Sequence, residues 1–348
     1  MESIFGTDGI RGKVGQSIVT VQGMMQLGKA VGTWMLQQKK SPLVLIATDT
    51  RHSAALLKNA FKTGILQFPV IIHDAHVLPT PALFYHTVHT DAYDFGIMLT
   101  ASHNQYRDNG IKIFSKVNGK LNEQDESTLT QLFFEALPEP HYENLGYEKT
   151  VTGCMESYLE SIRSHFPEQF LKGISLVVDT AHGAYAFTIT QFLESLGAQV
   201  ISIGKEPNGK NINLECGSLY PQAIAQLIKT HNAHAGFAFD GDGDRLIAIA
   251  QDGTIKDGDE LLGFLMNNPF YQQTPACVGT ILSNQALENY LGSTGKPFYR
   301  TPVGDKLVVQ KMKAVGALLG GEPSGHIILR DFSNTADGLF VLLQVAYT

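Results

Sequence analysis

One supersecondary pattern recurs along the chain and limits the folds that it can adopt. A short apolar or β-branched run ends in Asp, Thr, Ser or Asn, a loop of small residues follows, and a helical pattern then begins. The pattern occurs in "LVLIATDTRHSAALLKNAF", "DFGIMLTASHN", "ISLVVDTAHGAYAFTITQFLESLG", "AGFAFDGDGDRLIAI" and "ACVGTILSNQALENYL". Strands that alternate with helices form βαβ units and mostly parallel sheets, whose ligand sites lie at the carboxyl ends of the strands. The sequence therefore predicts an α/β fold with its polar loops on a functional face.

The length of 348 residues suits about two to three domains. The polar, proline-bearing stretch 135–153 reads as a linker, and a turn near 251–253 opens a further unit, so we expect domains at 1–150, 151–252 and 253–348. The final segment, "TADGLFVLLQVAYT", predicts an apolar helix with neither a glycine cap nor a polar tail. We expect that this helix end is exposed and that the sequence is cut short.

Net charge and cysteine usage exclude several classes of protein. The formal net charge of −7 argues against a nucleic-acid surface and against a polybasic membrane patch. No apolar run reaches the length of about 18 residues that a membrane-spanning helix needs. Cys154, Cys216 and Cys277 are widely spaced and contain no C-x-x-C pair, so we expect reduced, mostly buried thiols. These features, and an N-terminus without a signal-peptide pattern, predict a cytoplasmic location.

The stretch "FAFDGDGDRL" is the most informative motif for chemistry. Asp240, Asp242 and Asp244 alternate with glycine directly after a predicted strand, so their carboxylates can face one centre. Three carboxylates with no nearby His or Cys favour a hard cation, Mg²⁺ or Ca²⁺. An EF-hand is excluded because Arg245 and Gln251 stand where that loop needs Gly and Glu. A solvated acidic turn and a structural calcium site are the alternatives.

Ser102, in "LTASHNQYRDNGIKI", is a candidate nucleophile. It lacks the G-x-S-x-G elbow of hydrolases, and His103 is a poor candidate base because neighbours on a turn seldom face each other. A serine in this position is more often a helix N-cap. The aspartate loop and Arg245 favour phosphoryl transfer, which makes Ser102 a candidate phosphate carrier. Lys112 and Arg107 could supply cationic groups to the same loop.

Two further loops are candidate ligand-binding segments. The glycine-rich stretch "FGTDGIRG" at 5–12 contains Asp8 and Arg11, and a plain turn is its alternative interpretation. In "GGEPSGHIIL" at 320–329, Glu322, Ser324 and His326 occupy alternate positions. In an extended segment these three side chains would point to one side, where they could recognise a polyol ring. A surface turn that leads into a strand is the alternative for this stretch.

Taken together, these motifs resemble those of the α-D-phosphohexomutase family. "TASHN" with "NGIK" is similar to the family's phosphoserine loop, "DGDGDR" to its metal loop and "GEPSGH" to its sugar-specificity loop. "FGTDGIRG" and "EPNGKNIN" at 206–213 are particularly similar to the glucosamine branch. The resemblance implies consecutive three-layer α/β/α domains, with mixed and mostly parallel sheets, around a central cleft.

The resemblance also implies a mechanism. Phosphorylated Ser102 gives its phosphoryl group to a hexosamine 6-phosphate, and the 1,6-bisphosphate then returns its other phosphate to Ser102. Mg²⁺ is held by the Ser102 phosphate and the three aspartates. Glu322, Ser324, His326 and Lys306 bind the substrate, whereas Arg11, Lys112, Arg245 and His326 stabilise charge or transfer protons. The choice between Lys112 and His326 as general acid/base stays open, and relatives imply a possible homodimer.

Three departures from the family pattern leave alternatives. Gln105 replaces a proline of the phosphoserine loop, and Lys306 stands where the glucosamine branch commonly has Arg, so that contact loses bidentate geometry. The family's fourth domain, with its phosphate-gripping loop, has no counterpart here. A mannose- or glucose-phosphate mutase, a truncated non-catalytic sugar-phosphate-binding module and, as the weakest alternative, a serine hydrolase are the competing functions.

Overall fold

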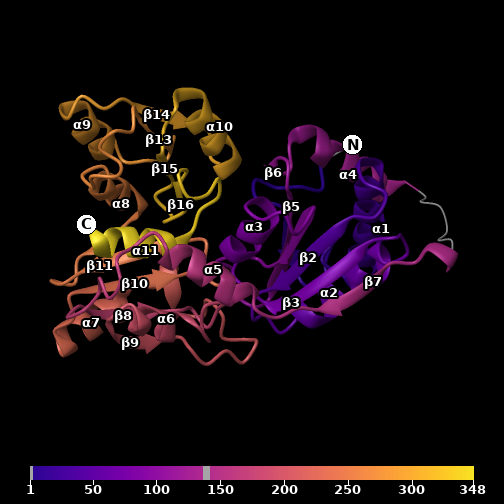
Figure 1. Ribbon diagram of the computed structural model, residues 1–348, viewed down its shortest axis with the longest axis horizontal. Helices are drawn as coiled ribbons and strands as arrows, with labels where there is room; N and C mark the ends of the chain where they lie inside the picture. The colour runs from indigo at the N-terminus through magenta and orange to yellow at the C-terminus, as the bar shows by residue number, and fades with distance from the viewer. Residues whose placement is uncertain (1–2, 136–141) are drawn as a thin grey trace. The chain divides into compact units, whose positions relative to one another are not determined.

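The computed structural model describes residues 3–135 and 142–348 and contains two compact units. The first unit comprises Met1–Tyr158 with Asn208–Lys210, and the second comprises Leu159–Pro207 with Asn211–Thr348. Figure 1 labels their elements along the chain, and each unit is an assembly of sheets and helices. The predicted α/β class is therefore confirmed.

The first unit contains one mixed sheet with strand order β1-β5-β4-β2-β3-β7, and β6 pairs with β5. Its strands are β1 (Ile10–Lys13), β2 (Leu43–Thr48), β3 (Ile71–Val77), β4 (Phe95–Leu99), β5 (Asp108–Ser115), β6 (Gly119–Lys120) and β7 (Tyr147–Thr150). Its helices are α1 (Val21–Gln38), α2 (Ala54–Ile65), α3 (Thr80–Val88) and α4 (Glu123–Phe134), with a 3₁₀ turn η1 (Tyr142–Asn144). The division between the two units falls within α5 (Cys154–Arg163).

Helices cover both faces of this sheet. The alternate residues Phe95, Ile97 and Leu99 of β4 join the large apolar core beneath α1, α2 and α4. Gly96 faces the other way, and a Cβ there would lie 2.2 Å from Oγ1 of Thr87 on α3. The missing side chain thus lets α3 pack closely on the second face.

The second unit contains two sheets. The five-stranded sheet has the order β12-β11-β10-β8-β9, and the four-stranded sheet has the order β14-β13-β15-β16. The strands are β8 (Ser175–Asp179), β9 (Gln199–Ile203), β10 (Ala235–Phe239), β11 (Leu246–Ala250), β12 (Ile255–Lys256), β13 (Cys277–Thr280), β14 (Phe298–Thr301), β15 (Leu319–Gly321) and β16 (Ile327–Leu329). The helices are α6 (Ile189–Ser195), α7 (Gln222–His231), α8 (Gly258–Leu265), α9 (Gln285–Ser293), α10 (Asp305–Val315) and α11 (Gly338–Tyr347), with a 3₁₀ turn η2 (Gly217–Leu219).

Two of the five predicted strand–loop–helix segments continue differently. The loops after β4 and β10 lead into the antiparallel strands β5 and β11, not into helices. Parallel pairing links β2 to β3 and β4, β8 to β9 and β10, and β13 to β14 and β15. The sheets are mixed because each pairs such a parallel set with at least one antiparallel strand.

The expected linker at 135–153 is partly wrong. Residues 136–141 lie outside the described part of the chain, but Tyr147–Thr150 forms β7, which pairs in parallel with β3 at the sheet edge. The stretch lacks periodicity because all four residues of this strand are exposed. Within this stretch, residues 147–150 therefore belong to the edge of the first sheet.

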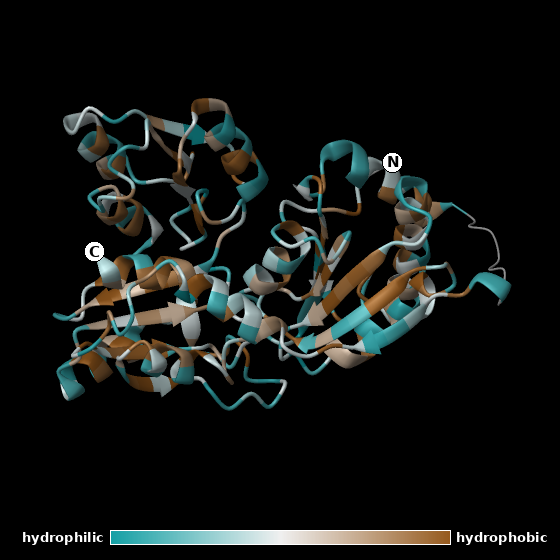
Figure 2. Ribbon diagram, viewed as in Figure 1, coloured by the Kyte–Doolittle hydropathy of each residue, from teal (hydrophilic) through white to brown (hydrophobic). Residues whose placement is uncertain are grey.

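Only the end of the final helix is exposed as predicted, because Tyr347 is 42% exposed while the body of the helix is buried. Asp337 caps α11 by accepting a hydrogen bond from the backbone N–H of Phe340, and Leu339 to Leu343 are at most 1% exposed. The helix packs on β11, α8 and β16, and Figure 2 shows it as a largely hydrophobic element. The body of this helix is therefore part of the core of the second unit.

The remaining expectations from composition concern the cysteine thiols and membrane-spanning helices. All three cysteines are free, Cys277 is buried, and Cys154 and Cys216 are half-buried. Burial raises the pKa of Cys216 and that of Cys277 to about 12. Within residues 3–135 and 142–348, none of the helices combines the length and apolar character needed to cross a bilayer.

Candidate active site

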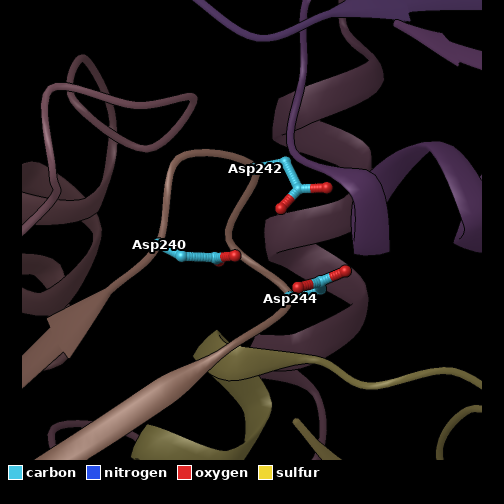
Figure 3. A group of neighbouring side chains, drawn as sticks. All are labelled: Asp240, Asp242 and Asp244. Carbon is cyan, nitrogen blue, oxygen red and sulfur yellow. The ribbon is translucent and has the colours of Figure 1, made fainter. Parts of the chain in front are cut away.

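The three predicted metal ligands converge on one loop of the second unit. Asp240, Asp242 and Asp244 lie in the turn that joins β10 to β11, and each is at most 2% exposed. One carboxylate oxygen from each lies within 4.8 Å of the others. Figure 3 shows the three carboxylates extending to the same side of the loop. The alternation of Asp with Gly therefore produces the convergence that the sequence predicts.

Backbone contacts hold this metal loop (residues 240–245) in shape. Oδ1 of Asp240 accepts hydrogen bonds from the backbone N–H groups of Gly243 and Arg245, each at 3.1 Å. Gly243 has φ +77°, a conformation that glycine adopts without a steric penalty. Helix α11 abuts the loop, because a Cβ on Gly338 would lie 2.8 Å from the carbonyl oxygen of Arg245.

The electrostatics of the loop fit a divalent cation. Three buried carboxylates this close repel one another strongly unless positive charge lies among them. Arg245 contributes a positive charge at the edge of the loop, since its Nε atom is 4.0 Å from Oδ2 of Asp240. Oxygen ligands alone are typical of Mg²⁺ or Ca²⁺ sites. The donor set therefore suits a hard metal ion better than a solvated turn.

His326 links the metal loop to the start of α10. Its Nε2 atom lies 3.6 Å from Oδ2 of Asp244 and 3.7 Å from Oδ2 of Asp305, and the residue is 4% exposed. Its Nδ1 atom has no hydrogen-bond partner among the described residues. The sequence analysis did not single out Asp305, although it directly precedes Lys306, which lies half-buried in the first turn of α10.

The prediction that Glu322, Ser324 and His326 lie in an extended segment is wrong. Residues 322–325 form a turn between β15 and β16, in which the Gly325 N–H donates to the Glu322 carbonyl. Glu322 and Ser324 nevertheless face each other, because the Ser324 hydroxyl lies 3.3 Å from Oε2 of Glu322. Oε1 of Glu322 also accepts a hydrogen bond from the Gly304 N–H at 3.2 Å, which brings the loop before Lys306 alongside.

The turn is fixed to the metal loop through the backbone. The N–H of Leu246, which follows the metal loop, donates to the carbonyl of Gly325 at 3.0 Å. Gly325 has φ +85°, and a Cβ there would lie 2.3 Å from the Leu246 carbonyl oxygen. Within the second unit, the structure thus brings together the metal loop, Arg245 and the predicted sugar-binding residues (Lys306, Glu322, Ser324 and His326).

Ser102 lies in the first unit, in the loop between β4 and β5. It is 1% exposed and has φ +50°, a left-handed conformation that costs a non-glycine residue about 1 kcal/mol or more. It is not a helix N-cap, because a strand follows. The expectation that His103 faces away is also wrong, since Oγ of Ser102 lies 3.2 Å from Nδ1 of His103. Backbone strain of this kind concentrates at functional sites.

Two of the three predicted cations of the first unit, Lys112 and Arg11, contact polar side chains of the first unit, and Lys120 joins Lys112. Nζ of Lys112 lies 2.9 Å from Oδ2 of Asp8, and Nζ of Lys120 lies 2.7 Å from its Oδ1. Arg11 contacts the Ser102 loop directly, because its Nη1 atom donates to Oδ1 of Asn104 at 3.4 Å. Arg107, by contrast, is exposed, and its guanidinium lies 5.9 Å from the ring centre of Tyr106. Lys120 and Asn104 were missed at the sequence level.

Asp49 and Arg51 are a further buried pair that sequence reasoning missed. Nε of Arg51 lies 2.8 Å from Oδ2 of Asp49, and both side chains are fully buried. The available signal was an aspartate at the end of a predicted strand with an arginine two residues later. A buried ion pair is costly unless its polar groups make further hydrogen bonds, so we expect this pair to bond to other groups nearby.

Comparisons with known proteins agree with this geometry. Three family models match the chain, described as phosphoglucomutase/phosphomannomutase α/β/α domains I, II and III, at residues 2–139, 156–253 and 257–348. The phosphoglucosamine mutase of Aliarcobacter butzleri (strain RM4018) is 39% identical over 98% of this chain and 78% of its own length. The chain belongs to the phosphohexomutase family.

Solved structures show the same fold in other members of the family. A phosphoglucomutase/phosphomannomutase family protein from Burkholderia thailandensis matches with a TM-score of 0.84 at 24% identity, over 99% of this chain and 76% of that one. An Aspergillus fumigatus N-acetylphosphoglucosamine mutase, solved with GlcNAc-6P and magnesium, matches with a TM-score of 0.61 at 15% identity, over 98% and 76%. The expectation of consecutive α/β/α phosphohexomutase domains is confirmed.

Proposed function

We propose that this phosphohexomutase interconverts glucosamine 6-phosphate and glucosamine 1-phosphate, with Ser102 as the phosphate carrier. The observation that carries the chemistry is the set of three buried carboxylates, within 4.8 Å of one another, on a loop that also contains Arg245. The sugar follows from the relatives that match nearly the whole chain, which are phosphoglucosamine mutases.

The reaction consists of two successive phosphoryl transfers. In the first, the sugar 1-hydroxyl attacks phosphorus, the bond from phosphorus to Oγ of Ser102 breaks, and the hydroxyl proton passes to a base. The bisphosphate then presents its 6-phosphate, Oγ attacks it, and the bond from phosphorus to sugar O6 breaks while the base returns its proton to O6. Glucosamine 1-phosphate leaves and Ser102 carries a phosphoryl group again. His103, 3.2 Å from Oγ, is placed to give and take the proton of the serine.

Asp240, Asp242 and Asp244 hold Mg²⁺ in this proposal. When bound, the ion neutralises charge on the phosphoryl oxygens during transfer. The further prediction that the Ser102 phosphate is also a metal ligand rests on the family resemblance.

The other residues bind substrate and move protons. Glu322 accepts hydrogen bonds from sugar hydroxyls, and Ser324 donates to them. Lys306, Arg245 and Arg11 place positive charges against phosphate oxygens. Lys112, held by Asp8, and His326, held between two aspartates, are the candidates for the general acid/base at the sugar hydroxyls. A cytoplasmic location and a homodimer complete the proposal as sequence-based predictions.

The test is transfer of a phosphoryl group to the chain. The protein and Mg²⁺ are incubated with the 1,6-bisphosphates of glucosamine, glucose and mannose in turn, and peptide mapping locates the added phosphate. We expect Ser102 to be labelled fastest by the glucosamine compound. Faster labelling by another sugar would reassign the substrate, and no labelling by any of the three would favour a non-catalytic binding module.

A further inference from the structure

Arg51 directs four of its five N–H donors to the loop that contains Ser102 and the fifth to Asp49. Nη2 donates to the carbonyl oxygens of Ser102 at 2.8 Å and Asn104 at 2.7 Å. Nη1 donates to the carbonyl oxygens of Gln105 at 2.6 Å and Asp108 at 3.1 Å. Nε donates to Asp49. A guanidinium has five N–H donors, so each of them is matched.

Asp49 extends the same network to the other side of Ser102. Its Oδ2 atom accepts a hydrogen bond from the hydroxyl of Thr100 at 2.7 Å, and Oγ1 of Thr100 accepts one from the Ser102 N–H at 2.9 Å. The N–H of Ser102 is thus tied to Asp49 through Thr100, and its C=O is tied directly to Arg51. Both polar groups of the Ser102 backbone depend on this buried ion pair.

This network explains how the loop keeps an unfavourable conformation. Ser102 has φ +50°, which surrounding contacts must hold in place. The loop is also held at Gln105, whose backbone carbonyl accepts a hydrogen bond from Nη1 of Arg51 at 2.6 Å. Lysine cannot replace this arginine, because an ammonium has three donors and no planar fork.

We infer that Arg51 is a positioning residue for phosphoryl transfer, which fixes the backbone of residues 100–108 so that Oγ of Ser102 points at its reaction partner. The inference rests on the proposed function of Ser102 as the phosphate carrier. Misplacement of a reacting atom by about 1 Å can cost about 100-fold in rate. Loss of the five-donor network should therefore lower kcat and leave KM little changed.

The experiment compares Arg51→Lys and Thr100→Val with the wild-type chain. Thr100→Val nearly keeps the volume of the side chain but removes the hydroxyl between Asp49 and the Ser102 N–H. Lys58→Met is the stability control, because Lys58 is buried in the same unit and pairs with Asp74 on β3. Hydrogen exchange of the peptides covering 100–108, the rate of Ser102 phosphorylation, kcat and KM are measured at temperatures where every variant is fully folded.

We expect faster exchange confined to residues 100–108 in both test variants, with phosphorylation and kcat about 100-fold lower in Arg51→Lys. Lys58→Met should keep wild-type exchange in that loop and wild-type kcat. Wild-type exchange and kcat in Arg51→Lys would overturn the inference, as would an equal loss of kcat in Lys58→Met. If Arg51→Lys does not fold, Thr100→Val decides by the same criteria.

Failure of the proposed function gives a different result. A wild-type chain that no sugar bisphosphate phosphorylates would refute the carrier role of Ser102. Hydrogen exchange would then decide alone whether Arg51 orders the loop: faster exchange in the variants supports that role, and unchanged exchange overturns it.

Discussion

The hydroxyl oxygen of Ser102 lies 3.2 Å from Nδ1 of the adjacent His103. Neighbouring side chains on a turn usually diverge, but the left-handed backbone at Ser102, φ +50°, accompanies the approach of these two. In the proposed reaction, this contact supplies a proton donor or acceptor to an oxygen that serves both as leaving group and as nucleophile. The strained conformation of Ser102 fits that proposal.

We predict that His103→Ala slows phosphorylation of Ser102 by about 100-fold, because proton transfer to or from Oγ loses its partner. Quenched-flow labelling with a sugar 1,6-bisphosphate measures the rate. His231→Ala, at an exposed position on α7, should behave as wild type. An unchanged rate in His103→Ala would leave the contact without a role in transfer.

Ser102→Ala should abolish labelling and mutase activity together. A serine hydrolase would also lose activity with this change, but it would keep its activity with Asp242→Ala. Activity that survives Asp242→Ala would thus favour the hydrolase alternative over phosphoryl transfer.

One substitution in the metal loop should have opposite effects on stability with and without metal. Asp242→Asn removes one of three like charges that lie within 4.8 Å, so we expect a more stable protein in EDTA, by about 1 kcal/mol. The same change should reduce the stabilisation by Mg²⁺, because a ligand that binds only the folded state stabilises less as its affinity falls. Thermal unfolding with EDTA and with a Mg²⁺ series tests both effects. Asp252→Asn, at an exposed turn outside the loop, should change neither.

The ionisation of Asp74 should make the stability of the protein depend on pH. Burial raises the pKa of Asp74, but hydrogen bonds from Lys58 and the His76 N–H, together with the charges of Lys58 and Lys62, outweigh it and lower the pKa below 3.8. Stability from the ionised carboxylate is therefore complete above the ordinary pKa and is lost only as the pH falls below it.

Asp74→Asn should lower the free energy of unfolding by about 3 kcal/mol at pH 7, because buried Lys58 loses its counter-charge and buried Lys62 keeps only its pair with Glu148. Urea unfolding at pH 7 and at about pH 3 measures the difference, which should shrink at the acidic value. Asp91→Asn removes the exposed pair with Lys116 and should change little. A pH-independent difference would show that the carboxylate charge does not carry the effect.

The close contact of Gly338 with the metal loop should make metal affinity depend on the packing of α11. An alanine Cβ there would lie 2.8 Å from the carbonyl of Arg245 and 3.0 Å from that of Gly243, so the loop must shift. We expect Gly338→Ala to weaken Mg²⁺ binding about tenfold, measured by calorimetry. Gly292→Ala, in α9 with open space around the new methyl group, should bind Mg²⁺ normally and gain about 0.5 kcal/mol in stability.

Local features of the site could be predicted from the sequence, and features that depend on distant partners could not. The convergence of Asp240, Asp242 and Asp244 follows from residue types within a single turn between two strands. The turn at Glu322 was misjudged as extended because bonds to Leu246 and Gly258, far away in the sequence, help to bend it. Arg51 was missed for the same reason, since its carbonyl partners lie more than 50 residues further along the chain.

In the fold, too, local features could be predicted from the sequence, and features that depend on distant partners could not. Apolar runs located the strands, but they did not distinguish a following helix from an antiparallel strand after β4 and β10. The apolar pattern of α11 predicted a helix correctly, yet periodicity could not reveal that β11 and α8 cover it. Burial depends on the partners that the chain supplies elsewhere.

The contact between Gly338 and the metal loop also bears on how the protein is made. A ribosome releases residues 240–245 well before it reaches the start of α11, and domains fold in order of synthesis. Until Gly338 and its helix emerge, the carbonyls of Gly243 and Arg245 lack the surface on which they rest. A growing polypeptide thus carries its three aspartates before α11 supports them, so in the proposed function the loop binds its ion only after α11 has docked.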